Sequence, residues 1–134
     1  LQALKGRDGL SSPSVPALVA HIAAYRDGAP WLDALRDYLQ ANMRYVADTL
    51  NNAFPALCWQ PPEATYLAWI DLRPLNVDDR ALQQALIAEQ KVAIMPGYTY
   101  GPEGNGFLRL NVGCPREKLE RGVEGLIAAL RSLS

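Results

Sequence analysis

The chain has 134 residues, a length typical of one domain, with 49% hydrophobic and 20% charged side chains. Its 13 basic and 14 acidic residues leave a formal net charge of −1, without the basic excess of a nucleic-acid-binding surface. Uninterrupted apolar runs are only a few residues long, far too short for a membrane-spanning helix. We therefore expect a folded domain with neither nucleic acid nor a membrane as its partner.

Cysteine and histidine are scarce. Cys58 and Cys114 are the only two cysteines, a usage typical of cytoplasmic proteins with free thiols rather than of a disulfide framework. His21 is the only histidine, so cysteine and histidine alone cannot supply the four ligands of a zinc site, and we predict no metal. The apolar neighbours of His21 favour a place in or beside the core over a catalytic role.

The first half of the chain predicts a loop and two helices. Glycine and serine through residue 13 indicate the loop, after which Ser12 or Ser14 caps a helix that ends at Gly28. The apolar face of this helix consists of Val15, Leu18, Val19 and Ile22. A second helix is predicted over 30–53, about 36 Å long at ~1.5 Å per residue. That length favours a bridge between two bodies.

The second half predicts short, alternating elements. Asn76 is expected to cap a helix, with Asp79 three residues later, and Pro115 to open the final helix. Strands are predicted over 65–73, 91–96 and 107–113. The order β-α-β-β-α predicts a small α/β layer with helices on one side of the sheet. The intervening sequence GPEGNG lacks the closing lysine of a phosphate-binding loop and favours a connection between strands.

Arg109 lies in the middle of the last predicted strand. Alternation gives that strand an apolar face of Leu108, Leu110 and Val112 and an opposite face of Phe107, Arg109 and Asn111. A guanidinium in this position needs an anion or several acceptors, and its planar fork suits a carboxylate. The spacing alone leaves two interpretations equally open: a carboxylate-binding site, or an ion pair with an internal acid such as Asp71.

Two motifs point to a known family. Residues 92–113 contain the pattern V-x-x-x-P-G-x-x-Y-G followed by G-x-x-R-L-N-x-G; YLAWIDLR precedes it, and RLNVGCPR overlaps its end. This combination resembles the C-terminal part of fold-type I pyridoxal-phosphate (PLP) enzymes of the aminotransferase superfamily. Within it, the chain resembles the cystathionine β-lyase branch, and in particular the bifunctional β-cystathionases that also regulate the maltose regulon. The opening LKGRDGLSSPSV fits as well, so the resemblance covers essentially the whole chain.

The resemblance implies a domain organisation. Residues 1–29 would end the large PLP-binding domain, 30–54 would form the interdomain helix, and 55–134 the small C-terminal α/β domain. The lysine that binds PLP in the family lies in a Ser-x-x-Lys segment, which none of Lys5, Lys91 and Lys118 matches. The resemblance thus implies a C-terminal piece that is inactive alone.

The resemblance also implies roles for individual residues. Arg109 matches the arginine that clamps the substrate α-carboxylate. Ser11 and Ser12 match a loop that reaches the neighbouring subunit's active site in a homodimer. Tyr98 and Tyr100 match the loop beside the substrate entrance, although plain packing would also account for these two tyrosines.

Three functions remain open on this basis. The first is C–S β-elimination on cystathionine-like amino acids, which yields a thiol, pyruvate and ammonia. The second is transamination, with the same cofactor and the same arginine. The third, implied by the resemblance to the bifunctional type, is restraint of a transcription activator through protein–protein contact.

Overall fold

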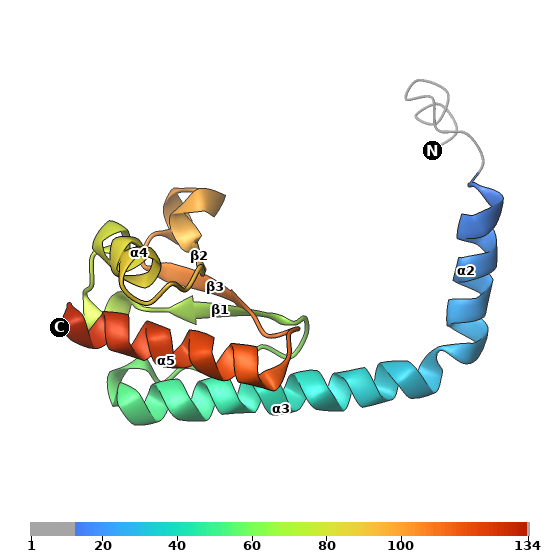
Figure 1. Cartoon of the computed structure of the whole chain (residues 1–134), viewed down its shortest axis with the longest axis horizontal. Helices are drawn as coiled ribbons and strands as arrows, with labels where there is room; N and C mark the ends of the chain where they lie inside the picture. Colours follow the sequence, from blue (N-terminus) through green and yellow to red (C-terminus); the bar gives the residue numbers. More distant parts are fainter. Residues whose placement is uncertain (1–12, 134) are drawn as a thin grey trace, which may run out of the picture. The chain divides into compact units, whose positions relative to one another are not determined.

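The computed structural model describes residues 13–133. Two α-helices come first, and three strands and two further α-helices follow in the C-terminal part. In chain order these are α2 (Val15–Asp27), α3 (Ala29–Ala53), β1 (Leu67–Asp71), α4 (Asp79–Ala88), β2 (Met95–Pro96), β3 (Phe107–Asn111) and α5 (Arg116–Ser132) (Figure 1). The chain divides into two compact units between Asp37 and Tyr38. Among the described residues, no helix is both long and apolar enough to cross a membrane.

Helix α2 begins and ends where the sequence predicts. The Ser14 side chain accepts a hydrogen bond from the Ala17 amide at 3.4 Å, and Gly28 caps the C-terminus. None of the residues of α2 is buried. The prediction for His21 is therefore wrong: its side chain is exposed and packs against Tyr25, with 4.8 Å between the ring centroids.

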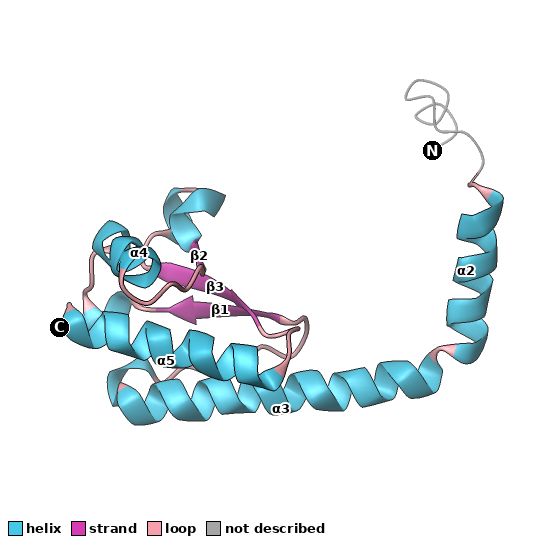
Figure 2. Ribbon diagram, in the orientation of Figure 1, coloured by secondary structure: helices cyan, strands magenta, loops and turns pink. Residues whose placement is uncertain are grey.

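Three antiparallel strands form one sheet in the order β1-β3-β2 (Figure 2). The predicted order β-α-β-β-α is confirmed, with β1 shorter than the predicted 65–73. Register is set by the central strand, in which Arg109 lies opposite Trp69 of β1 and opposite Met95 of β2. Arg109 is thus the middle residue of a row that crosses all three strands.

One face of the sheet forms the core. Leu108, Leu110 and Val112 are at most 8% exposed, which confirms the predicted apolar face of the last strand. Side chains from α3, α4 and α5 join them in one hydrophobic cluster, and α4 contacts α5. Figures 1 and 2 show α5 and the C-terminal part of α3 on the same side of the sheet. Burial on this side leaves the face that carries Arg109 open.

The second strand is shorter than predicted. Residues 91–94 do not pair in the sheet, because their backbone closes the end of α4 instead. Lys91 adopts a left-handed conformation with φ 57°, and the Val92 amide donates to the Leu86 carbonyl at 2.9 Å. Ile94 is still buried, so the apolar pattern reports burial here and not strand pairing.

The predicted cap of α4 is also wrong. Asn76 has a φ of 50° and ends a short 3₁₀ turn, Arg73–Leu75. The N-cap is Asp78, whose carboxylate accepts hydrogen bonds from the amides of Arg80 at 3.0 Å and Ala81 at 2.7 Å. Asparagine suits either position, since it tolerates the left-handed region as well as capping helices.

The glycine-containing segment folds back on itself to connect β2 with β3. It forms two 3₁₀ turns, Gly97–Tyr100 and Pro102–Gly104. A Cβ atom at Gly97 would collide with the Gly104 carbonyl oxygen, and a Cβ at Gly104 would collide with that of Gly97. Two stretches of the backbone therefore cross at a separation that only glycine allows. The crossing holds the 3₁₀ turn that ends at Tyr100 in place.

Candidate functional site

Arg109 lies half-buried on the open face of the sheet. Its cross-strand neighbours are Trp69, 39% exposed, and Met95, 44% exposed. The guanidinium makes no ion pair and no hydrogen bond with any residue in 13–133, and its contact is with the ring of Tyr100, 4.8 Å from Cζ to the centroid. The arginine is thus held by apolar and aromatic groups, with its hydrogen-bond donors free for an anion.

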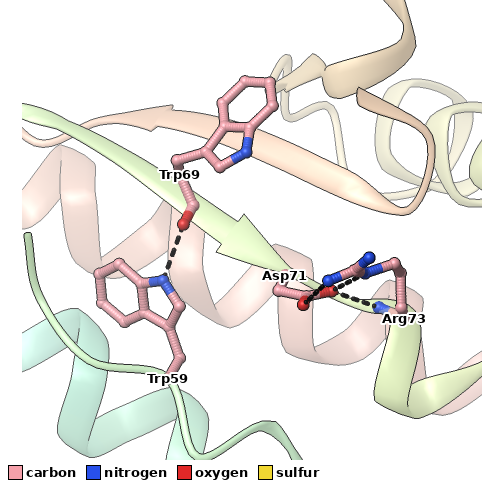
Figure 3. A network of polar contacts seen from close by, with 4 residues as sticks. All are labelled: Trp59, Trp69, Asp71 and Arg73. Carbon is pink, nitrogen blue, oxygen red and sulfur yellow. Dashed lines mark hydrogen bonds and ion pairs between the residues drawn. The ribbon is translucent and has the colours of Figure 1, made fainter. Parts of the chain in front are cut away.

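The alternative ion pair between Arg109 and Asp71 does not form. The Asp71 carboxylate instead binds Arg73 through Nη2 at 2.7 Å and Nε at 2.9 Å (Figure 3). The side-chain hydrogen bond from Arg73 lowers the pKa of Asp71, against a smaller opposing effect of burial. Asp71 lies opposite Phe107 at the end of β1, two positions along the strand from the Trp69–Arg109 pair, and its carboxylate is already occupied by Arg73.

Three aromatic rings lie beside Arg109, and we call Tyr100, Trp69 and Phe107 the aromatic row. Tyr100 meets Trp69 edge to face, with 5.7 Å between centroids. Trp69 stacks on Phe107 at 5.5 Å with an interplanar angle of 20°. The guanidinium of Arg73 then covers Phe107 at 4.6 Å. The row therefore has an arginine at each end, one paired with Asp71 and one free.

The main chain of Trp69 is fixed from the opposite face of the sheet. The indole Nε1 of Trp59, which is 7% exposed, donates a 2.8 Å hydrogen bond to the Trp69 carbonyl. Figure 3 shows the two indoles on opposite sides of the β1 backbone. Trp69 thus presents its ring to the open face from an anchored strand.

The structure separates the two tyrosines that the sequence grouped. Tyr100 contacts Arg109, whereas Tyr98 contacts Arg80, whose Cζ is 5.0 Å from the ring centroid. Tyr98 also lines a pocket of about 450 Å³ whose lining does not include Arg109. Ser11 and Ser12 lie outside the described residues.

Sequence reasoning missed Trp69 and Met95 as neighbours of Arg109. The alternation in LAWID does place Trp69 on the same face as Asp71, which was a usable signal. The register that aligns Trp69 and Met95 with Arg109 has no such signal, because it depends on how three strands separated by long connections meet.

The described residues do not make up a PLP site. Lys91 donates its Nζ hydrogen bond to the Ala88 carbonyl at the end of α4, and Lys118 is exposed on α5. Neither of these two lysines contacts Arg109, and Lys5 lies outside the described residues. Within residues 13–133, the cationic group that has no acidic partner on the open face of the sheet is the guanidinium of Arg109.

Comparison with known proteins identifies relatives that cover nearly the whole chain. The chain is 72% identical to Protein MalY of Escherichia coli (strain K12), with 99% of this chain and 34% of that protein covered. It is 40% identical to cystathionine beta-lyase PatB of Bacillus subtilis (strain 168), with 92% of this chain and 32% of that protein covered. The chain therefore spans about a third of the length of the curated relatives that it matches.

Solved structures agree with this result. The crystal structure of the PLP-bound C-S lyase from Staphylococcus hominis superposes with a TM-score of 0.82 at 32% identity, over 94% of this chain and 34% of the other. The aminotransferase class I and II family model matches residues 2–126, which covers the sheet and both long helices. The chain thus belongs to the aminotransferase class I and II family, whose fold-type I enzymes use pyridoxal 5'-phosphate as cofactor.

Proposed function

We propose that this chain is the C-terminal part of a PLP-dependent C–S β-lyase that acts on cystathionine-like amino acids. In that reaction the C–S bond breaks, water is consumed, and a thiol, pyruvate and ammonia are released. The similarity to a cystathionine beta-lyase and to a C-S lyase supports this reaction. Transamination is the alternative, and analysis of the products of the intact enzyme separates the two: pyruvate with a thiol, or a new amino acid.

The observation that carries the proposal is the free guanidinium of Arg109. Substrates of this class all have an α-carboxylate, and arginine binds a carboxylate through two parallel N–H···O bonds. Two bonds fix the orientation of the substrate as well as its position, which is what controls the alignment of bonds at Cα. We assign to Arg109 the role of α-carboxylate clamp and to Tyr100 a place beside it.

The domain organisation follows from the same proposal. Residues 1–29 would complete a large domain, 30–54 would form the connecting helix, and 55–134 would be the small domain that carries Arg109. In a homodimer, Ser11 and Ser12 would face the active site of the neighbouring subunit. The two free cysteines support a cytoplasmic location.

A second proposal concerns a protein partner. The 72% identity to Protein MalY supports a role linked to the maltose regulon, in which the protein would restrain a transcription activator. The balanced charge of the chain is compatible with a protein partner. A pull-down of the purified activator, with and without substrate, tests this role independently of catalysis.

Substitution of Arg109 tests the clamp in the intact protein. Arg109→Lys keeps the charge but loses the planar fork, so one charge-assisted hydrogen bond, worth about 1.5–3 kcal/mol, disappears. We expect kcat/KM for cystathionine to fall roughly 10- to 150-fold and the melting temperature to change little. Arg109→Ala should lose more. Arg80→Lys, at the separate pocket, is the matched control and should keep near-normal kinetics.

Near-normal kcat/KM together with a large drop in the melting temperature of Arg109→Lys would contradict the clamp. That combination would mean that the arginine is structural.

A further inference from the structure

We infer that Tyr100 is a positioning residue for Arg109, and that Trp69 and Phe107 support it as the aromatic row. This inference deepens the proposed function and rests on it, because it concerns how the carboxylate clamp is held ready. Tyr100 acts here through Arg109, by means of its ring face.

The first step is the contact of Arg109 itself. An arginine side chain has several rotatable bonds, and on an open sheet face it would sample many rotamers. Within the described part of the chain, the Tyr100 ring is the partner that restrains the guanidinium, at 4.8 Å. A ring below the guanidinium plane leaves the N–H groups at its edge unoccupied, and those are the groups that bind a carboxylate.

The second step is the support of Tyr100. Tyr100 is 50% exposed and lies in a 3₁₀ turn, so it needs packing to define its ring position. Trp69 provides that packing edge to face. Trp69 itself lies in β1, directly opposite Arg109, with its carbonyl bound by Trp59 (Figure 3).

The third step is the far end of the row. Phe107 stacks on Trp69 and is also contacted by the guanidinium of Arg73, which Asp71 holds by two side-chain hydrogen bonds. Arg73 and Arg109 thus lie at the two ends of one row of rings, and among the described residues only Arg73 of the two is paired with an acid. The difference indicates that the row holds the guanidinium of Arg109 while leaving its charge for a ligand.

Tyr98 supplies a control within the same turn. It is the same residue type, two positions earlier, and its ring also meets an arginine, but that arginine is Arg80. A general effect of losing a tyrosine from this turn should appear at both positions, whereas an effect through Arg109 should appear only at Tyr100.

The test compares two ligands on the intact, PLP-loaded protein. L-Alanine carries the α-carboxylate and L-alaninamide carries a neutral amide in its place, and the Kd of each is measured by calorimetry. We expect Tyr100→Leu to raise the Kd for L-alanine by about 3- to 30-fold and the Kd for L-alaninamide by less than about twofold. Tyr100→Phe keeps the ring and should stay within about twofold of wild type for both ligands, as should Tyr98→Leu. Tyr100→Met serves as a second ringless variant, and circular dichroism checks the folding of each.

Coupling gives a further readout. In an Arg109→Ala background, Tyr100→Leu should cause no additional loss of L-alanine binding, because the residue through which it acts is gone. Trp69→Leu should reproduce part of the effect of Tyr100→Leu, with less than additive loss in the double variant.

Three results would overturn the inference. Equal loss with Tyr100→Phe and Tyr100→Leu would assign the effect to the hydroxyl. Equal weakening of both ligands would mean that Tyr100 contacts the ligand or only shapes the turn. Unchanged binding in Tyr100→Leu would remove the role altogether. Failure of the proposed function can be told apart from failure of this inference. If Arg109 does not bind the carboxylate, Arg109→Lys itself leaves the ratio of L-alanine to L-alaninamide affinity unchanged.

Discussion

Asn42 links helix α3 to the segment that follows β3. Its side chain is 1% exposed, donates from Nδ2 to the Val112 carbonyl at 2.9 Å, and accepts at Oδ1 from Nη1 of Arg116 at 3.2 Å. Both ends of the amide are therefore used inside the core. A buried polar group in such a position stabilises the fold only while its partners remain.

Replacement of Asn42 by leucine should destabilise the protein. The Val112 carbonyl would lose this buried hydrogen bond, which we expect to cost about 1–3 kcal/mol in the free energy of unfolding. Asn52→Leu, on an exposed position of the same helix, is the control and should change stability by less than about 0.5 kcal/mol. Urea denaturation of the two variants measures the difference, and equal stability would show that water replaces the lost bond.

Asp71 should make stability depend on pH. The Arg73 hydrogen bond lowers the folded-state pKa of Asp71 below its ordinary value of 3.8, so the ionised carboxylate stabilises the folded state above that pH. The stabilisation is lost as the pH falls through the folded-state pKa. We expect wild type to exceed Asp71→Asn in stability at pH 7 and pH 5, and the gap to close as the pH falls below the folded-state pKa.

Denaturant titrations at those pH values measure the gap. Asp48→Asn is the control, since Asp48 is exposed and makes no ion pair within residues 13–133. A gap between wild type and Asp71→Asn that widens on acidification would contradict the assignment.

At the scale of elements, two glycines of α5 differ in their surroundings. A Cβ at Gly122 would have no atom within 4 Å, whereas a Cβ at Gly125 would lie 2.8 Å from Cγ2 of Val92. Gly122→Ala should therefore stabilise the protein by about 0.5–1 kcal/mol through helix propensity alone. Gly125→Ala should gain less or destabilise, because Val92 must move. Chemical denaturation of the two variants tests this order, which a more stable Gly125→Ala would reverse.

Elements that follow a strict period were predictable from the sequence. The alternation over Phe107–Asn111 gave both the strand and the face of Arg109, because side chains of a strand point alternately to opposite sides. The length of the second strand was not predictable in this way. The backbone after α4 closes that helix instead, through the hydrogen bond from the Val92 amide to the Leu86 carbonyl. Asn76 was misplaced because a capping residue and a left-handed turn residue have the same sequence signal.

The candidate site was predictable only in part, for a related reason. The guanidinium on an open face follows from alternation, but its neighbours do not. Trp69 and Met95 reach Arg109 through the register of the sheet, and Tyr100 through the crossing of Gly97 and Gly104. The register is a long-range feature of the sheet, and the crossing is a backbone contact within one connecting segment, so neither follows from the alternation of side chains along a strand.

At the scale of the whole molecule, helix α2 has an uncovered apolar side. Val15, Leu18, Val19 and Ile22 are 73%, 47%, 62% and 60% exposed. Apolar surface of this kind favours association, so we expect the 134-residue polypeptide, expressed alone, to self-associate. Glutamate at Val15 and Ile22 together should shift it toward monomer in sedimentation velocity, and Arg26→Glu on the same helix should not. A monomer at high concentration in the unsubstituted chain would refute this.

The three tryptophans lie in three different environments. Trp31 is 69% exposed and belongs to the first unit, Trp59 is 7% exposed in the core of the second, and Trp69 is 39% exposed beside Arg109. Indole emission shifts to longer wavelength with contact with water, so each of these side chains has its own spectral signature. Variants that keep a single tryptophan would turn the chain's own fluorescence into three separate reporters: one of the N-terminal helices, one of core unfolding, and one of the surroundings of Arg109, where we propose that a carboxylate binds.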